Sequence, residues 1–109
     1  MELSLLYYFK TVAEQENITK AAELLYISQP ALSKAIAKLE KSLDVTLFER
    51  RKGRISLSAM GRVYYEYVSS AFEVLESGEK KLEEMKQTSG ETVSIASPVA
   101  GVLQELIYN

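Results

Sequence analysis

The feature that most constrains the fold is a break of three residues, at 26–28, between two helical patterns. Before the break, closely spaced small and apolar residues predict a short helix over about 19–25, which Thr19 can cap with its side-chain oxygen. After the break, one apolar face predicts a helix over about 29–42, with Ser28 as its N-cap. Two helices joined so closely must cross and bury their facing sides in one small core.

Apolar periodicity predicts two further helices, and a strand pattern lies between them. The first helix runs over about 3–15, and the last begins after a cap at Ser58 and continues to about Lys86 without a proline. The strand pattern in 47–57 predicts a small β-hairpin with its turn at Lys52-Gly53, because glycine tolerates a positive φ. The last helix spans about 40 Å at 1.5 Å per residue, so part of its apolar stripe must meet another chain or domain.

We therefore expect three regions along the chain. Residues 1–57 form the domain that contains the crossed helices, and 58–87 form the long helix. Residues 88–109 form a hinge, a strand over 92–96 and a helix that begins near Pro98. Because one strand and one helix do not make a domain, we expect the chain to stop just inside a larger unit.

The chain contains neither cysteine nor histidine. This absence excludes disulfides, thiolate nucleophiles, Ser-His-Asp and Cys-His triads, and metal sites built from those residues. No apolar run approaches the ~20 residues that a membrane span needs, and the N-terminus lacks the pattern of a signal peptide. A cytoplasmic protein without enzymatic activity is the default expectation.

Charge is unevenly distributed along the chain. The formal net charge is -2, yet residues 28–54 hold seven Lys or Arg against three Asp or Glu. A locally basic segment in an acidic chain is typical of a nucleic-acid-binding face. The segment coincides with the second helix of the crossed pair and with the hairpin.

The crossed pair predicts a helix-turn-helix whose second helix enters the major groove of double-stranded DNA. Gln29, Ser33 and Lys34 face outward near the start of that helix. Gln can read adenine with two hydrogen bonds, Ser adapts to either partner, and Lys reaches guanine or phosphate. The basic residues in 50–54 would then act as a wing against the flanking DNA.

The residues at 21–25, 27–34, 47–50 and 55–61 resemble the N-terminal domain of LysR-type transcriptional regulators. The resemblance covers about 1–65 closely and 66–97 in pattern. It implies a mainly α fold: a winged helix-turn-helix of three helices and a small β-hairpin, followed by a linker helix that pairs antiparallel in a homodimer. The function that it implies is sequence-specific transcription regulation.

Position by position, the resemblance implies contacts to DNA from two parts of the domain. The implied contacts from the helix-turn-helix are Thr19, Ser28, Gln29, Pro30, Ser33 and Lys34, and those from the wing are Arg50, Arg51, Lys52 and Arg54. At position 34 the family often has Arg; Lys lacks the planar fork, which favours contact with a phosphate over base readout. The expected dimer stripe along the long helix consists of Tyr64, Tyr67, Ala71, Val74, Gly78 and Met85.

Family members normally continue into an effector-binding domain. The resemblance therefore implies an unknown small-molecule effector for that domain and a dimer that can become a tetramer in the full-length protein. For residues 1–109 we expect no cofactor, and the lack of His, Cys and clustered Asp argues against a metal site. The glutamates between 73 and 84 are interpreted as the solvent-facing side of the long helix rather than as a metal site.

Three alternatives stay open. The first is another winged-helix class, such as a MarR-like or molybdate-responsive regulator; the residues at 28–34 and the long helix after the wing argue against it. The second is a dimeric protein-interaction module that has lost DNA binding, although Gln29, Ser33, Lys34 and Arg54 are all present. The third is an enzyme, against which stands the lack of His, Cys and a glycine-rich phosphate loop.

Overall fold

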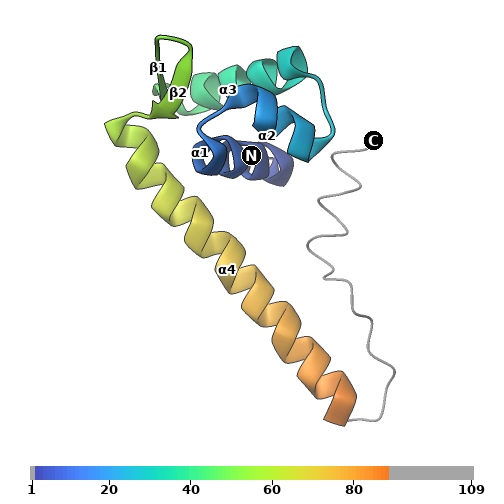
Figure 1. Cartoon of the computed structure of the whole chain (residues 1–109). Helices are drawn as coiled ribbons and strands as arrows, with labels where there is room; N and C mark the ends of the chain where they lie inside the picture. The colour runs from blue at the N-terminus through green and yellow to red at the C-terminus, as the bar shows by residue number, and fades with distance from the viewer. Residues whose placement is uncertain (1, 89–109) are drawn as a thin grey trace.

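The computed structural model describes residues 2–88, which form four helices and one hairpin (Figure 1). The helices are α1 (Leu3–Gln15), α2 (Ile18–Leu25), α3 (Gln29–Leu43) and α4 (Ala59–Thr88), and the strands are β1 (Phe48–Arg51) and β2 (Arg54–Leu57). The predicted fold, a mainly helical winged helix-turn-helix followed by a long helix, is confirmed. The strand expected over 92–96 and the helix expected after Pro98 lie outside the described residues.

The core lies where α1, α2 and α3 cross. Each helix contributes buried apolar side chains, among them Phe9, Val12, Ala21, Leu25, Leu32, Ile36 and Leu39. Ala21 is fully buried and Ala22 is 4% exposed, and their small side chains let α2 approach its neighbours closely. The crossed pair predicted from the sequence therefore has the shared core that its apolar pattern required.

Side-chain caps fix where α2 and α3 begin. The Oδ1 of Asn17 accepts the Lys20 backbone N–H at 2.9 Å, so Asn17 is the N-cap of α2. The expected cap at Thr19 is wrong because α2 already begins at Ile18, which places Thr19 inside the first turn. Ser28 caps α3 as predicted, accepting from a backbone N–H in its first turn at 3.2 Å.

The hairpin is antiparallel, with Arg51 opposite Arg54 at its tip. Lys52 and Gly53 have φ values of 51° and 75°, the two positive values that a two-residue type I′ turn requires. On its inner face Ile55 is 5% exposed, whereas the tip is exposed. The hairpin is thus anchored by one apolar side and carries its basic residues into solvent.

The backbone at Leu47 is where α3, the hairpin and α4 meet. Leu47 donates its N–H to Glu40 Oε2 at 2.6 Å, and its carbonyl accepts the Ser58 N–H at 2.9 Å. The Ser58 hydroxyl donates to the Thr46 carbonyl at 2.6 Å and accepts the Gly61 N–H at 3.0 Å, which makes Ser58 the predicted cap of α4. We call this arrangement of Glu40, Thr46, Leu47, Ser58 and Gly61 the Leu47 clasp.

The long helix α4 leaves the domain as a single rod (Figure 1). Its first half packs on α1, where the Phe72 ring lies 5.8 Å from Tyr7 and the Tyr64 ring lies 5.5 Å from Phe9. Tyr64, expected in the dimer stripe, is therefore half-buried in its own chain. None of the helices within 2–88 is long and apolar enough to cross a membrane.

A polar contact joins the same two helices at the surface. Tyr65 donates its hydroxyl to Glu14 Oε2 at 2.7 Å, and Lys10 Nζ lies 3.0 Å from the same oxygen. The hydrogen bond to Glu14, together with burial, raises the pKa of Tyr65 above its ordinary value. Burial alone would lower the pKa of Lys10, but the hydrogen bond and the charge of Glu14 outweigh it and raise that pKa.

Replacing Gly61 tests the Leu47 clasp. A Cβ at this position would overlap with the Leu47 carbonyl oxygen and lie 3.0 Å from Leu57 Cδ2. Overpacking of this kind costs about 1–3 kcal/mol, which exceeds the gain of about 0.5–1 kcal/mol from placing alanine in a helix. We expect Gly61→Ala to lower the free energy of unfolding in urea by about 1–2 kcal/mol.

The matched control is Gly78→Ala, on the same helix. A Cβ at Gly78 meets nothing within 4 Å in its own chain, so as a monomer this variant should gain about 0.5–1 kcal/mol. Because Gly78 belongs to the expected dimer stripe, both variants are compared at protein concentrations where the chain is a monomer. Equal stabilisation by both substitutions would contradict the close approach at Gly61.

Candidate nucleic-acid interface

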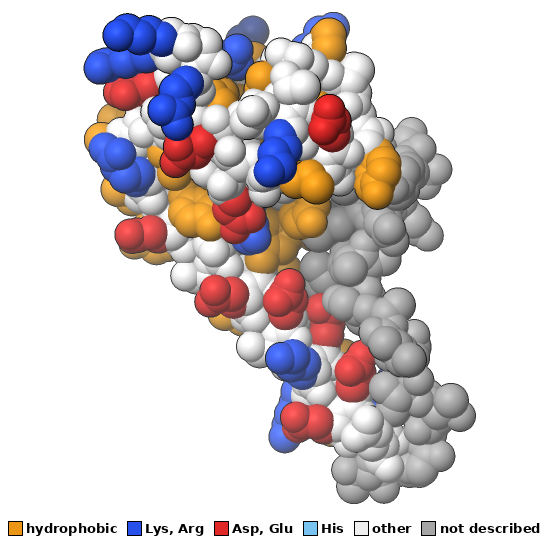
Figure 2. Space-filling view, in the orientation of Figure 1, with side chains coloured by type: hydrophobic (Ala, Val, Ile, Leu, Met, Phe, Trp, Pro, Cys, Tyr) orange, Lys and Arg blue, Asp and Glu red, His pale blue; other side chains and the backbone are white. Residues whose placement is uncertain are grey.

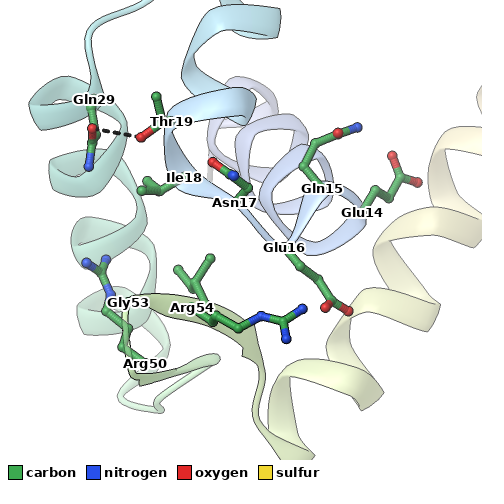
Figure 3. Close-up of a pocket in the computed structure, with 11 residues that line it drawn as sticks. Glu14, Gln15, Glu16, Asn17, Ile18, Thr19, Gln29, Arg50, Gly53 and Arg54 are labelled. Carbon is green, nitrogen blue, oxygen red and sulfur yellow. Dashed lines mark hydrogen bonds between the residues drawn. The ribbon is translucent and has the colours of Figure 1, made fainter.

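A groove between α2, α3 and the hairpin gathers four of the ten predicted DNA-contacting residues. Thr19, Gln29, Arg50 and Arg54 line it, and we call it the wing groove (Figure 3). Figure 3 shows Arg50 pointing from the hairpin toward α3 and Arg54 pointing toward Glu16 on the other side. The structure therefore brings the start of the second helix and the wing together, as a winged helix-turn-helix requires.

The other predicted contacts from the helix-turn-helix lie along the outward side of α3. Pro30 and Lys34 are exposed, and Ser33 is half-buried. Ser28 is exposed, and because its oxygen accepts the Ala31 N–H, its hydroxyl proton remains available to a further acceptor. These side chains surround the N-terminal turn of α3, where the helix dipole favours an anion.

The remaining predicted wing residues, Arg51 and Lys52, lie outside the groove at the hairpin tip. Both are exposed, and the positive φ of Lys52 belongs to the turn itself. The wing thus presents its cations in two directions: Arg50 and Arg54 into the wing groove, and the other two into solvent.

The basic residues assigned to DNA form no ion pair with a carboxylate within 2–88, although Glu14 and Glu16 also line the wing groove. Over that range, ion pairs form at Lys10–Glu14, Lys38–Glu2 and Lys81–Glu84, and none involves the five basic residues assigned to DNA, which are Lys34, Arg50, Arg51, Lys52 and Arg54. In Figure 2, Lys and Arg gather around the hairpin end, whereas Asp and Glu prevail along α4. A cluster of cations of this kind attracts a polyanion.

Two side chains meet across the turn of the helix-turn-helix. The Thr19 hydroxyl donates to Gln29 Oε1 at 3.1 Å (Figure 3). This contact was not predicted from the sequence, where both residues were treated as independent contacts to DNA. Only the observed backbone, with Thr19 in the first turn of α2 and Gln29 at the start of α3, places them within reach.

Glu40 is a second residue whose role the sequence did not reveal. Besides Leu47, it accepts the Phe48 N–H at 3.3 Å, so one carboxylate holds the first backbone donors of the wing. It thereby fixes the hairpin relative to α3. The part of the chain that the structure describes contains no group of three or more His, Cys, Asp or Glu that could hold a metal ion.

Comparison with known families assigns this architecture. Residues 3–62 match the family described as bacterial regulatory helix-turn-helix proteins of the lysR family. The chain belongs to this family. The matched residues include every predicted contact to DNA, and the match favours the LysR type over the other winged-helix classes.

The curated relatives that the chain resembles are named as transcription regulators. A probable RuBisCO transcriptional regulator from Phaeodactylum tricornutum is 43% identical over 84 residues, covering 77% of this chain and 27% of the relative. The transcriptional dual regulator GltC from Bacillus subtilis is 37% identical over 100 residues, covering 92% of this chain and 33% of the relative. The chain thus spans between a quarter and a third of the length of these relatives.

Solved structures of LysR-type proteins match the fold. A complex of BenM_DBD with catB site 1 DNA has a TM-score of 0.71 at 33% identity, covering 83% of this chain and 95% of that one. DarR from Vibrio fischeri in complex with DNA has a TM-score of 0.69 at 28% identity, covering 81% and 30%. The fold and the family are those of DNA-binding transcription regulators.

Proposed function

We propose that this chain is the DNA-binding part of a sequence-specific transcription regulator. The observation that carries the proposal is the exposed first turn of α3 beside five cations that have no carboxylate partner within 2–88. In the proposal, α3 enters the major groove and the hairpin contacts the flanking backbone or minor groove. The DNA complexes of BenM_DBD and DarR support it, since both share this fold.

The side chains divide into two roles. Gln29 and Ser33 contribute to the choice of sequence, because an amide and a hydroxyl can pair with base edges. Lys34 and the four wing cations neutralise phosphates and supply most of the affinity. The proposal assigns no catalytic activity to the chain and places it in the cytoplasm with the DNA.

Salt dependence tests this division. Duplexes bound by the chain are first selected from a random library, and affinity is then measured by fluorescence anisotropy at several salt concentrations. Each lost phosphate contact lowers the slope of log affinity against log salt by about 0.9. We expect Lys34→Ala to lower the slope by about that amount.

Lys80→Ala, which removes the same charge from the exposed surface of α4, should leave the slope unchanged. A chain that selects no duplex, or a Lys80→Ala variant with the same loss as Lys34→Ala, would contradict the proposed interface.

We further propose that the partner of α4 is a second copy of this chain. The exposed face of α4 is apolar: Tyr67 is 72% exposed, Val74 69% and Met85 59%. Monomeric proteins rarely leave contiguous apolar surface of this kind uncovered. Of the predicted dimer stripe, Tyr67, Ala71, Val74, Gly78 and Met85 are exposed, and the large apolar residues Met60, Val63, Leu75 and Leu82 are exposed as well.

Side-chain sizes along α4 favour an antiparallel pair with one register. When the two-fold axis passes between 72 and 73, Tyr67 lies opposite Gly78 of the partner subunit, and Ala71 lies opposite Val74 of the partner subunit. Tyr67, the largest exposed side chain of the central stripe, then faces Gly78, which has no side chain. A Cβ built at Gly78 would meet nothing within 4 Å in its own chain, so there is room for the ring.

Val74→Glu tests the dimer face. A carboxylate at the centre of an apolar seam must be desolvated without a partner, so we expect the variant to sediment as a monomer at concentrations where the unaltered chain is a dimer. Lys80→Gln makes the same change in net charge on another side of α4 and should leave the dimer intact. An undiminished dimer of Val74→Glu would remove this face from the interface.

Engineered cysteines test the register, because the chain has none of its own. The double variant Tyr67→Cys with Gly78→Cys should form disulfide-linked dimers under mild oxidation, observed by non-reducing electrophoresis. Within one helix the two positions lie about 16 Å apart, too far for an intrachain bond.

The control is Tyr67→Cys alone, which should remain unlinked, since the two sulfurs in the dimer are separated by the same ~16 Å. Cross-linking of this single variant would contradict the proposed register.

An unknown small-molecule effector and a tetramer of the full-length protein stay proposals that rest on membership of the family. None of the described residues is assigned to either.

A further inference from the structure

The contact between Thr19 and Gln29 constrains what Gln29 can present to DNA. Both side chains are exposed, yet the backbones that carry them are fixed: Asn17 caps α2, Ser28 caps α3, and the two helices share the buried core around Leu25 and Leu32. The hydroxyl therefore meets the amide at 3.1 Å across a rigid turn rather than between mobile segments.

Counting protons on the two groups gives their roles. A threonine hydroxyl has one proton, and here that proton goes to Gln29 Oε1. Phosphate oxygens only accept hydrogen bonds, so Thr19 has no proton left for them while it holds Gln29. The Gln29 amide in turn keeps Oε1 on the side of α2 and directs Nε2, with both of its protons, away from Thr19 (Figure 3).

The orientation of the amide decides which base fits. Reading adenine with two hydrogen bonds needs an acceptor for N6 and a donor for N7, so both ends of the glutamine amide must face the base. Guanine presents two acceptors, O6 and N7, and suits a group that offers only donors. An amide held by its oxygen therefore favours guanine over adenine.

We infer that Thr19 is a positioning residue that sets the base preference of Gln29: it holds the amide oxygen, so that Gln29 reads guanine rather than adenine at one position of each half-site. The inference deepens the proposed function and rests on it. It also replaces the simpler expectations that Gln29 pairs with adenine and that Thr19 contacts DNA itself.

The test compares base preferences of four proteins by selection from a random duplex library followed by sequencing. They are the unaltered chain, Thr19→Val, Thr19→Ser and Gln29→Ala. Thr19→Val keeps the shape and removes the hydroxyl, Thr19→Ser keeps the hydroxyl, and Gln29→Ala marks the position in the site that Gln29 reads. Circular dichroism checks that each variant is folded.

Gln29→Ala should remove the base preference at one position of the site. At that position we expect the unaltered chain to prefer guanine over adenine by about tenfold. Thr19→Val should reduce that preference to within about twofold, because the amide can then turn and pair with adenine. Thr19→Ser should restore it. Total affinity should change less than the preference, which separates positioning from a lost contact.

Three results would overturn the inference. The first is that the Thr19→Val variant shows the same base preference as the unaltered chain. The second is a preference for an A·T pair over a G·C pair at the Gln29 position, which would show that the oxygen faces the base. The third is a Gln29→Ala profile unchanged at every position. Failure of the proposed function looks different, since the unaltered chain would then select no sequence at all.

Discussion

Everything outside the three-helix core depends on how the backbone at Leu47 is held. The Leu47 clasp uses a carboxylate from α3, a serine that begins α4 and a glycine that leaves room for both. Hydrogen bonds to a charged acceptor are shorter and stronger than those between neutral groups. A few atoms therefore set the angle of the wing to α3 and the direction in which α4 departs.

That geometry has consequences for DNA recognition. With the wing fixed against α3, its Arg50 and Arg54 line the same groove as Gln29 at the start of that helix (Figure 3). With α4 fixed as a rod, a second domain paired through it would stand at a fixed separation. Reading two half-sites at a defined spacing requires that rigidity.

Much of this fold follows from the sequence because periodicity and caps agree with each other. The apolar stripe at Leu32, Ile36 and Leu39 predicts α3 almost to the residue, and Ser28 marks its start. The tip at Lys52-Gly53 follows from the turn chemistry of glycine. The start of α2 was harder, since Asn17 and Thr19 are both good caps and only the backbone decides between them.

The candidate site was less predictable than the fold, because its details are contacts between separate elements. Periodicity places Gln29 on an outward face but does not reveal that Thr19 holds its amide. Tyr64 fits the exposed stripe by spacing, yet the position of Phe9 draws it into the domain. The clasp residue Glu40 looks in the sequence like any solvated glutamate of a helix, and its two backbone partners appear only once the chain is folded.

The central claim is that one surface, built from the first turn of α3 and the basic wing, meets DNA. The most direct test is an NMR titration of the isotope-labelled chain with a selected duplex, following every backbone amide. We expect the largest shifts at Ser28–Lys34 and at 50–54, with little change along the exposed face of α4. Largest shifts on α4, or shifts spread evenly over the domain, would contradict the claim.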